Sequence, residues 1–125
     1  MPSSFDYAVV RSVPRVEREE FINAGVVVFC PEEGFLGARV RVNEARLAAF
    51  APHIDLELVN NRLAGLMAVC KGDPTAGTVA RMGLRERFHW IVSPKSTVLQ
   101  MSAVHCGVCA SPERVLVRLF RELCL

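Results

Sequence analysis

The sequence lacks the features that would place it in a membrane or outside the cell. Its longest apolar runs, such as residues 24–30, stop far short of the ~20 residues that cross a bilayer. The first residues carry neither a basic segment nor an apolar signal core. The five cysteines are an odd number, and Cys30, Cys70 and Cys124 stand in apolar stretches where a free thiol acts as a small hydrophobe. We therefore expect a cytoplasmic protein with free thiols and no membrane association.

Motifs for phosphate binding, acyl transfer and metal binding are missing or incomplete. No glycine-rich loop leads into Lys-Ser or Lys-Thr, and no Gly-x-Ser-x-Gly turn presents a serine nucleophile. Cys106 and Cys109 have the spacing of half a tetrahedral zinc site, and His105 or His89 could add a nitrogen ligand, but no second pair completes the set. A thioredoxin-like dithiol would begin a helix, whereas Ser111 caps the helix that follows. We expect no metal and no cofactor.

Charge gives little support to a polyanionic partner. Fifteen Lys and Arg residues against thirteen Asp and Glu leave a net charge of +2, although thirteen of the cations are arginines. Arg39 and Arg41 alternate along one predicted strand, but stacking of bases needs exposed aromatic rings beside them. Tyr7 and Trp90 are the candidates outside the apolar stripes. Nucleic-acid binding is therefore kept only as an alternative.

Strand signals dominate the first third of the chain. Segments 5–13, 19–30 and 35–42 are rich in β-branched residues or alternate between apolar and polar positions. The short polar segment 14–18 and the turn at 31–34 join them, which predicts an antiparallel three-stranded meander. Asn23 and Gly25 interrupt the second strand, so we expect a bulge or a close backbone approach there.

Helix signals follow the meander. Asn43 and Asp55 are suitable N-caps for helices ending near Phe50 and at Gly72, and Ser111-Pro112-Glu113 begins a last helix. Residues 84–92 predict a further helix that Ser93-Pro94 ends, residues 97–104 alternate as a fourth strand, and 105–109 is interpreted as a loop. The result is an α+β fold over a single domain, 1–125, with an antiparallel sheet of about four strands packed by three to four helices.

Polar residues within the predicted sheet are the candidates for function. A hairpin loop centred between Arg15 and Val16 would place Val9 opposite Ile22 and Arg11 opposite Glu20. An exposed cross-strand pair of this kind contributes only ~0.2 to 1 kcal/mol, whereas a buried one costs desolvation and would indicate a site. His105 stands where the fourth strand leaves the sheet, and a histidine can act as acid or base near pH 7.

Several short motifs resemble one bacterial family. They are Tyr7-Ala-Val-Val-Arg11, Glu20-Phe-Ile-Asn23-Ala-Gly25, Arg87-Phe-His-Trp90, Pro94-Lys-Ser-Thr97, Gln100 and His105-Cys-Gly107. The family is the one catalogued as domain of unknown function 3037. The resemblance marks Arg11, Glu20, Asn23, Arg87, Gln100 and His105 as its polar positions, and it implies a HipA-like kinase as a partner. Cys106 and Cys109 depart from the pattern, where threonine-like residues are usual.

Three hypotheses of function follow. The first is an interaction or ligand-binding module whose polar cluster combines Arg11, Glu20, Asn23 and His105, with Arg87 nearby, because polar residues inside apolar strands are costly unless they satisfy one another. The second is an enzyme that uses His105 as acid or base and Arg11 or Arg87 as an anion clamp. The third is a structural subunit with no catalytic role, which predicts a large exposed apolar patch. The oligomeric state stays open.

Overall fold

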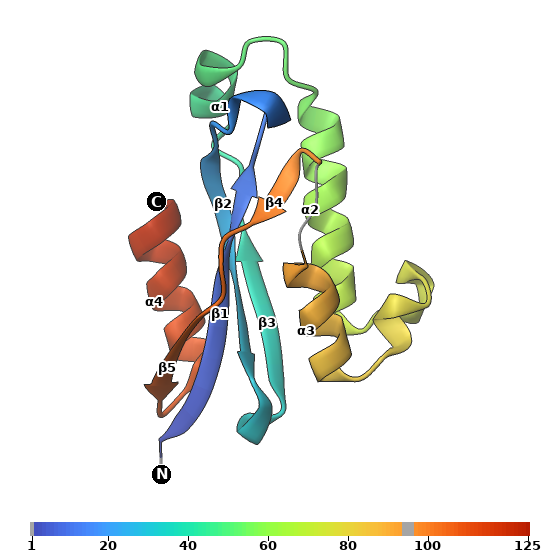
Figure 1. Ribbon diagram of the computed structural model, residues 1–125, viewed down its shortest axis with the longest axis vertical. Coiled ribbons are helices and arrows are strands. Elements are labelled where there is room, and N and C mark those ends of the chain that lie inside the picture. Colours follow the sequence, from blue (N-terminus) through green and yellow to red (C-terminus); the bar gives the residue numbers. More distant parts are fainter. Residues whose placement is uncertain (1, 94–96) are drawn as a thin grey trace.

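The computed structural model describes residues 2–93 and 97–125, and it has an α+β fold in three layers (Figure 1). An antiparallel sheet forms the middle layer. Helix α4 (Pro112–Cys124) covers one face, and helices α2 (Leu56–Lys71) and α3 (Leu84–Val92) cover the other. None of the helices in the described residues has the length and apolarity that a membrane span requires.

The predicted meander is confirmed, with a different register in its first hairpin. Strands β1 (Ser3–Ser12), β2 (Ile22–Cys30) and β3 (Phe35–Val40) follow one another as neighbours. A 3₁₀ turn, η1 (Val16–Arg18), and a left-handed Glu19 with φ of 56° lengthen the first loop. Val9 therefore pairs with Val26, and Arg11 pairs with Asn23. The predicted pairing of Val9 with Ile22 and of Arg11 with Glu20 is wrong.

The predicted irregularity in β2 is confirmed as a bulge. Val10 pairs with Gly25 and Arg11 with Asn23, which leaves Ala24 as an extra residue. Gly25 also lies against β3, because a Cβ there would stand 2.5 Å from the Arg39 carbonyl oxygen and 2.8 Å from Val40 Cγ1. Only glycine allows the two strands to approach so closely.

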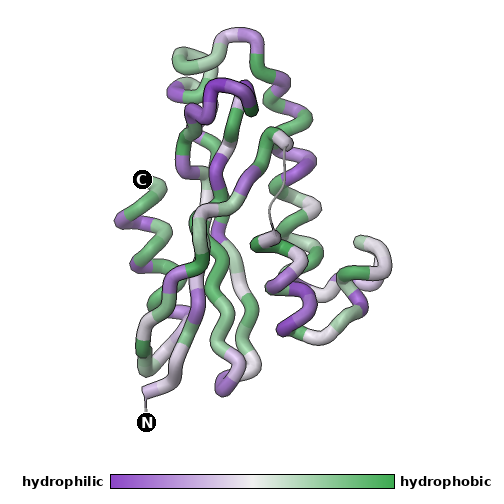
Figure 2. The backbone as a smooth tube through the Cα atoms, in the orientation of Figure 1, coloured by the Kyte–Doolittle hydropathy of each residue, from purple (hydrophilic) through white to green (hydrophobic). Residues whose placement is uncertain are grey.

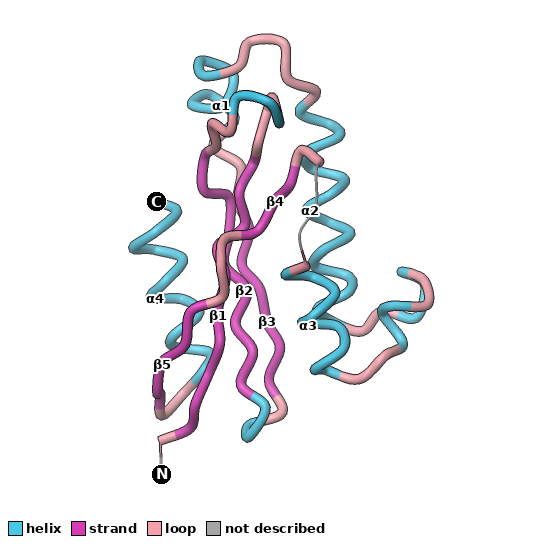
Figure 3. Tube along the Cα trace, viewed as in Figure 1, coloured by secondary structure: helices cyan, strands magenta, loops and turns pink. Residues whose placement is uncertain are grey.

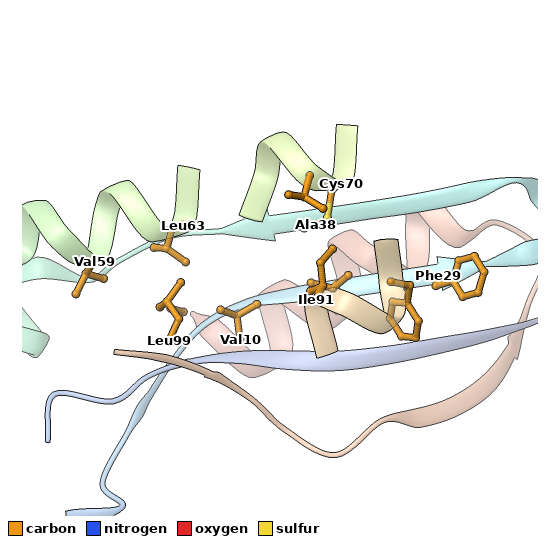
Figure 4. Close-up of a cluster of buried hydrophobic side chains, with 12 residues drawn as sticks. Val10, Phe29, Ala38, Val59, Leu63, Cys70, Ile91 and Leu99 are labelled. Atoms are coloured by element: carbon orange, nitrogen blue, oxygen red, sulfur yellow. The ribbon is translucent and has the colours of Figure 1, made fainter. Parts of the chain in front are cut away.

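Strand β2 is buried on both faces and divides the interior into two cores. Val27 and Phe29 face α2 and α3, where Phe29 stacks on Phe88 with ring centroids 5.0 Å apart. Figure 4 shows how Val59 and Leu63 of α2 and Ile91 of α3 meet the sheet on this side. The alternate residues Val26, Val28 and Cys30 face α4.

The helices begin and end at their predicted caps. Asn43, Asp55 and Ser111 side chains accept backbone N–H bonds at the starts of α1 (Glu44–Phe50), α2 and α4. Gly72 ends α2 with φ of 69°. Helix α3 also agrees with its predicted range, although Pro94, expected to end it, lies outside the described residues. Short 3₁₀ turns occupy Pro31–Glu33, Pro74–Ala76 and Val79–Arg81.

The predicted fourth strand, 97–104, is shorter in the structure, and a further strand follows it in the segment 105–109. Strand β4 (Leu99–Met101) pairs with the end of β1, and β5 (His105–Cys109) pairs with its beginning. Figure 3 shows the loop that separates them. Ser102 bridges this loop, because its backbone N–H donates to the Val9 carbonyl at 2.9 Å and its Oγ accepts from the Val9 N–H at 2.8 Å. The interpretation of 105–109 as a loop is therefore wrong.

Candidate functional site

Two of the predicted site residues, Arg11 and Asn23, meet on the face of the sheet that α4 covers. Arg11 stands between Asn23 of β2 and Gln100 of β4, and directly paired residues point to the same face. Asn23 Nδ2 donates to the Leu123 carbonyl oxygen at 3.0 Å, in the last turn of α4. The Arg11 guanidinium lies 4.1 Å from the centre of the Phe21 ring. This polar row thus joins three strands, and Asn23 connects it to the end of α4.

Glu20 lies apart from this row. It forms an ion pair with Arg18 in the loop between β1 and β2. Together with Arg15 and Arg18 it lines a groove of about 460 Å³, whose opposite wall is residues 50–54. Figure 2 shows how strongly hydrophilic this loop is. Arg15 also has a carboxylate partner, Glu17 at 3.7 Å, and such exposed pairs contribute ~1 kcal/mol or less.

Arg87 lies on the other side of the sheet, where it completes a helix end. Its Nη1 donates to the carbonyl oxygens of Val69 and Cys70, each at 3.0 Å. The Val69 carbonyl also accepts the Gly72 N–H at 3.1 Å, so the guanidinium adds a second donor there and supplies a donor to the Cys70 carbonyl at the negative end of the α2 dipole. The contacts of Arg87 give it a structural role.

His105 begins β5 and packs against Tyr7, with ring centroids 5.2 Å apart. Tyr7 and Arg11 are four residues apart on β1, which is ~13 Å at the usual rise of a strand. His105 therefore shares a face with Arg11 but makes no contact with it. The structure brings Arg11, Asn23 and Gln100 together, and it separates them from Glu20, Arg87 and His105.

Strand β5 is the feature that the sequence interpretation missed. Among residues 2–93 and 97–125 it pairs with β1 and with no other strand, so its outer edge is open. His105 and Cys106 are exposed, and Val104 and Val108 are 45% and 65% exposed. From Leu99 to Ser111 the chain has no Asp, Glu, Lys or Arg. That uncharged stretch, together with Cys106 and Val108 at alternate positions, is the signal that could have predicted the strand.

The cysteines of β5 point in opposite directions. Cys109 pairs with Ser3 and is buried next to Cys30, whereas Cys106 pairs with Asp6 and is exposed. Residues three apart on a strand face opposite sides of the sheet, so these two thiols do not converge on one ion. Burial raises the pKa of the Cys109 thiol, and the neighbouring Cys30 adds to the effect. Cys109 is thus a core residue and Cys106 a surface thiol.

Comparison with known proteins gives one result. Residues 7–124 match the family described as protein of unknown function DUF3037. The chain belongs to the DUF3037 family. No curated protein and no solved structure shows a significant match. The DUF3037 match spans all the strands and helices that form the sheet and its two covering layers, apart from the first residues of β1.

Proposed function

We propose that the protein is an interaction module that binds a partner strand along β5. The observation that carries this proposal is the open, uncharged edge of β5 with Val108 65% exposed. A sheet edge offers a row of backbone donors and acceptors, and folded proteins usually protect it with lysine, proline or a covering segment. Residues 105–109 have none of these protections in their sequence. Addition of a strand would satisfy the backbone groups and cover the valine.

The positions of the arginines favour this proposal over the enzyme hypothesis. A clamp beside His105 requires Arg11 or Arg87, but Arg11 lies ~13 Å along β1 from the residue that pairs with His105, and Arg87 binds the end of α2. Accessory nucleic-acid binding requires an aromatic ring beside Arg39. Trp90 lies on α3, whereas Arg39 pairs with Val26 and so points to the face of α4. Tyr7 shares that face but lies on β1, which β2 separates from β3, and it packs against His105.

The experiment that tests the proposal is site-specific photo-crosslinking inside cells. A photoreactive amino acid replaces Val108 in one variant and Arg39, on the other edge of the sheet, in a control variant. We expect adducts from position 108 and far fewer from position 39. Peptide mapping then identifies the captured partner, for which a HipA-like kinase and another copy of this chain are the candidates. The crosslinking is done in the cytoplasm, under reducing conditions. Equal or absent capture at position 108 would overturn the proposal.

A further inference from the structure

We propose that the strand that pairs with the open edge of β5 is β5 of a second copy. The two strands run antiparallel and are related by a two-fold axis through Gly107. This inference rests on the proposed function and names its partner. In such a pair His105 of one copy stands opposite Cys109 of the other, Cys106 opposite Val108, and Gly107 opposite Gly107. The two sheets then continue into each other, and the surface is self-complementary as a two-fold interface requires.

Charge supports self-pairing. Like charges directly opposite each other destabilise a pair of strands, and a strand that binds a charged partner strand carries charges of the opposite sign. Strand β5 carries no Asp, Glu, Lys or Arg, so a second antiparallel copy brings no such repulsion. By contrast, β3 carries Arg39 and is followed by Arg41, and both are exposed.

The side chains of the two faces also fit this arrangement. On one face Cys106 and Val108 would form two small apolar pairs related by the axis, which removes the exposed valine from water. On the other face the Phe5 ring covers Gly107, since a Cβ there would stand 2.8 Å from Phe5 Cζ. The centre of the interface is therefore filled on the α4 side before the second copy binds.

The contact is small, and this sets the expected affinity. A five-residue strand with one adjoining valine buries less than the ~800 Å² per partner of a standard interface. We expect a dimer that dissociates on dilution and has a Kd on the order of micromolar or weaker.

The first test follows mass against concentration by sedimentation or light scattering. The native chain should change from monomer to dimer, and Val108→Lys should raise the apparent Kd by about tenfold or more, because lysine protects an edge and repels its copy. Val117→Lys is the matched control, because Val117 is an exposed valine on α4. A native chain that is monomeric throughout, or a dimer that Val108→Lys leaves intact, overturns the self-pairing.

A second test uses the native thiol of Cys106, and its result does not depend on whether the lysine variant folds. Directly opposite residues have Cα atoms ~4.5 to 5.5 Å apart, within the range that a disulfide spans. With Val108→Cys, a mild oxidant that takes up two electrons and two protons for each bond should give a covalent dimer on a non-reducing gel. Adding Cys106→Ser should abolish it. Monomer alone in the first variant contradicts the register.

The two proposals fail separately. If the purified chain stays monomeric but a photoreactive residue at position 108 captures a different protein, the self-pairing is overturned and the interaction module stands. If position 108 captures nothing in cells, the interaction module is overturned as well.

Discussion

The two edges of the sheet differ in how they are protected. Strand β3 is packed by α2 on one face and α4 on the other, and it carries the exposed Arg39. Strand β5 has Phe5 against one face, exposed Cys106 and Val108 on the other, and no charged residue. The same sheet therefore has one edge that resists pairing and one that is free to pair. Because this fold can protect an edge strand, as it does at β3, the exposure of β5 is a feature of that strand and not something that the fold imposes.

The largest expected effect comes from a substitution at Gly25, where β2 packs closely against the protected edge strand β3. Gly25→Val places side-chain atoms into the Arg39 carbonyl and Val40, so we expect a loss of about 3 kcal/mol or more of unfolding free energy in urea. Gly65→Ala is the control, because its Cβ meets nothing within 4 Å and alanine suits the interior of α2. That variant should gain ~0.5 to 1 kcal/mol. Equal midpoints for the two variants would contradict the close packing of β2 and β3.

The next effect concerns α2, which supports β3 from one side. Arg87→Met removes the guanidinium that donates to the Val69 and Cys70 carbonyls, while the Gly72 N–H still donates to Val69, and should cost about 1 to 3 kcal/mol in a denaturant titration. Arg62→Met changes an exposed arginine on α2 itself and should cost less than about 0.5 kcal/mol. If both substitutions have the same small effect, Arg87 does not cap α2.

A smaller effect is expected at the open edge. Ser102→Ala leaves the Val9 N–H without its acceptor and should cost about 1 to 2 kcal/mol. Hydrogen exchange at the Val9 amide should become faster in the same variant. Ser4→Ala, at an exposed position on β1, serves as the control for the loss of a hydroxyl. Unchanged protection of Val9 would show that Ser102 does not hold β5 in place.

The smallest effect concerns the buried thiol of Cys70 on α2, the helix that packs against β3. Burial raises the pKa of Cys70 from 9.0 to about 12, so between these values the folded state holds a proton that the unfolded state releases. Stability should therefore fall as the pH rises through 9, and at about pH 9.5 it should be about 0.8 kcal/mol lower than at neutral pH. The difference between the native chain and Cys70→Ala measures this term. A difference independent of pH would contradict the shift.

The local elements were predictable because their signals are local. Asn43, Asp55, Gly72 and Ser111 mark helix ends through their own side chains or their lack of one. The register of the first hairpin was not predictable, because it depends on η1 and on a glutamate in the left-handed conformation. Glutamate rarely adopts that conformation, so the residue type does not indicate it.

The candidate site was predictable only in part. The resemblance and the polar character of Arg11, Asn23 and Gln100 marked residues that do meet. Which residues face one another across strands depends on register, so Glu20 was paired with the wrong arginine. Strand β5 was missed because Gly107 and the two cysteines suggest a loop, whereas its pairing comes from a distant strand, β1.

The break between β4 and β5 has a consequence for how this chain can change length. Val10 pairs with Met101 but Tyr7 pairs with His105, so the connection contains one residue more than a continuous ladder needs. Loss of one residue from Ser102–Val104 would leave every pairing of both strands as it is and fuse them into one straight strand. Relatives of this chain could thus differ by one residue here and keep the same core, while presenting a longer and flatter edge.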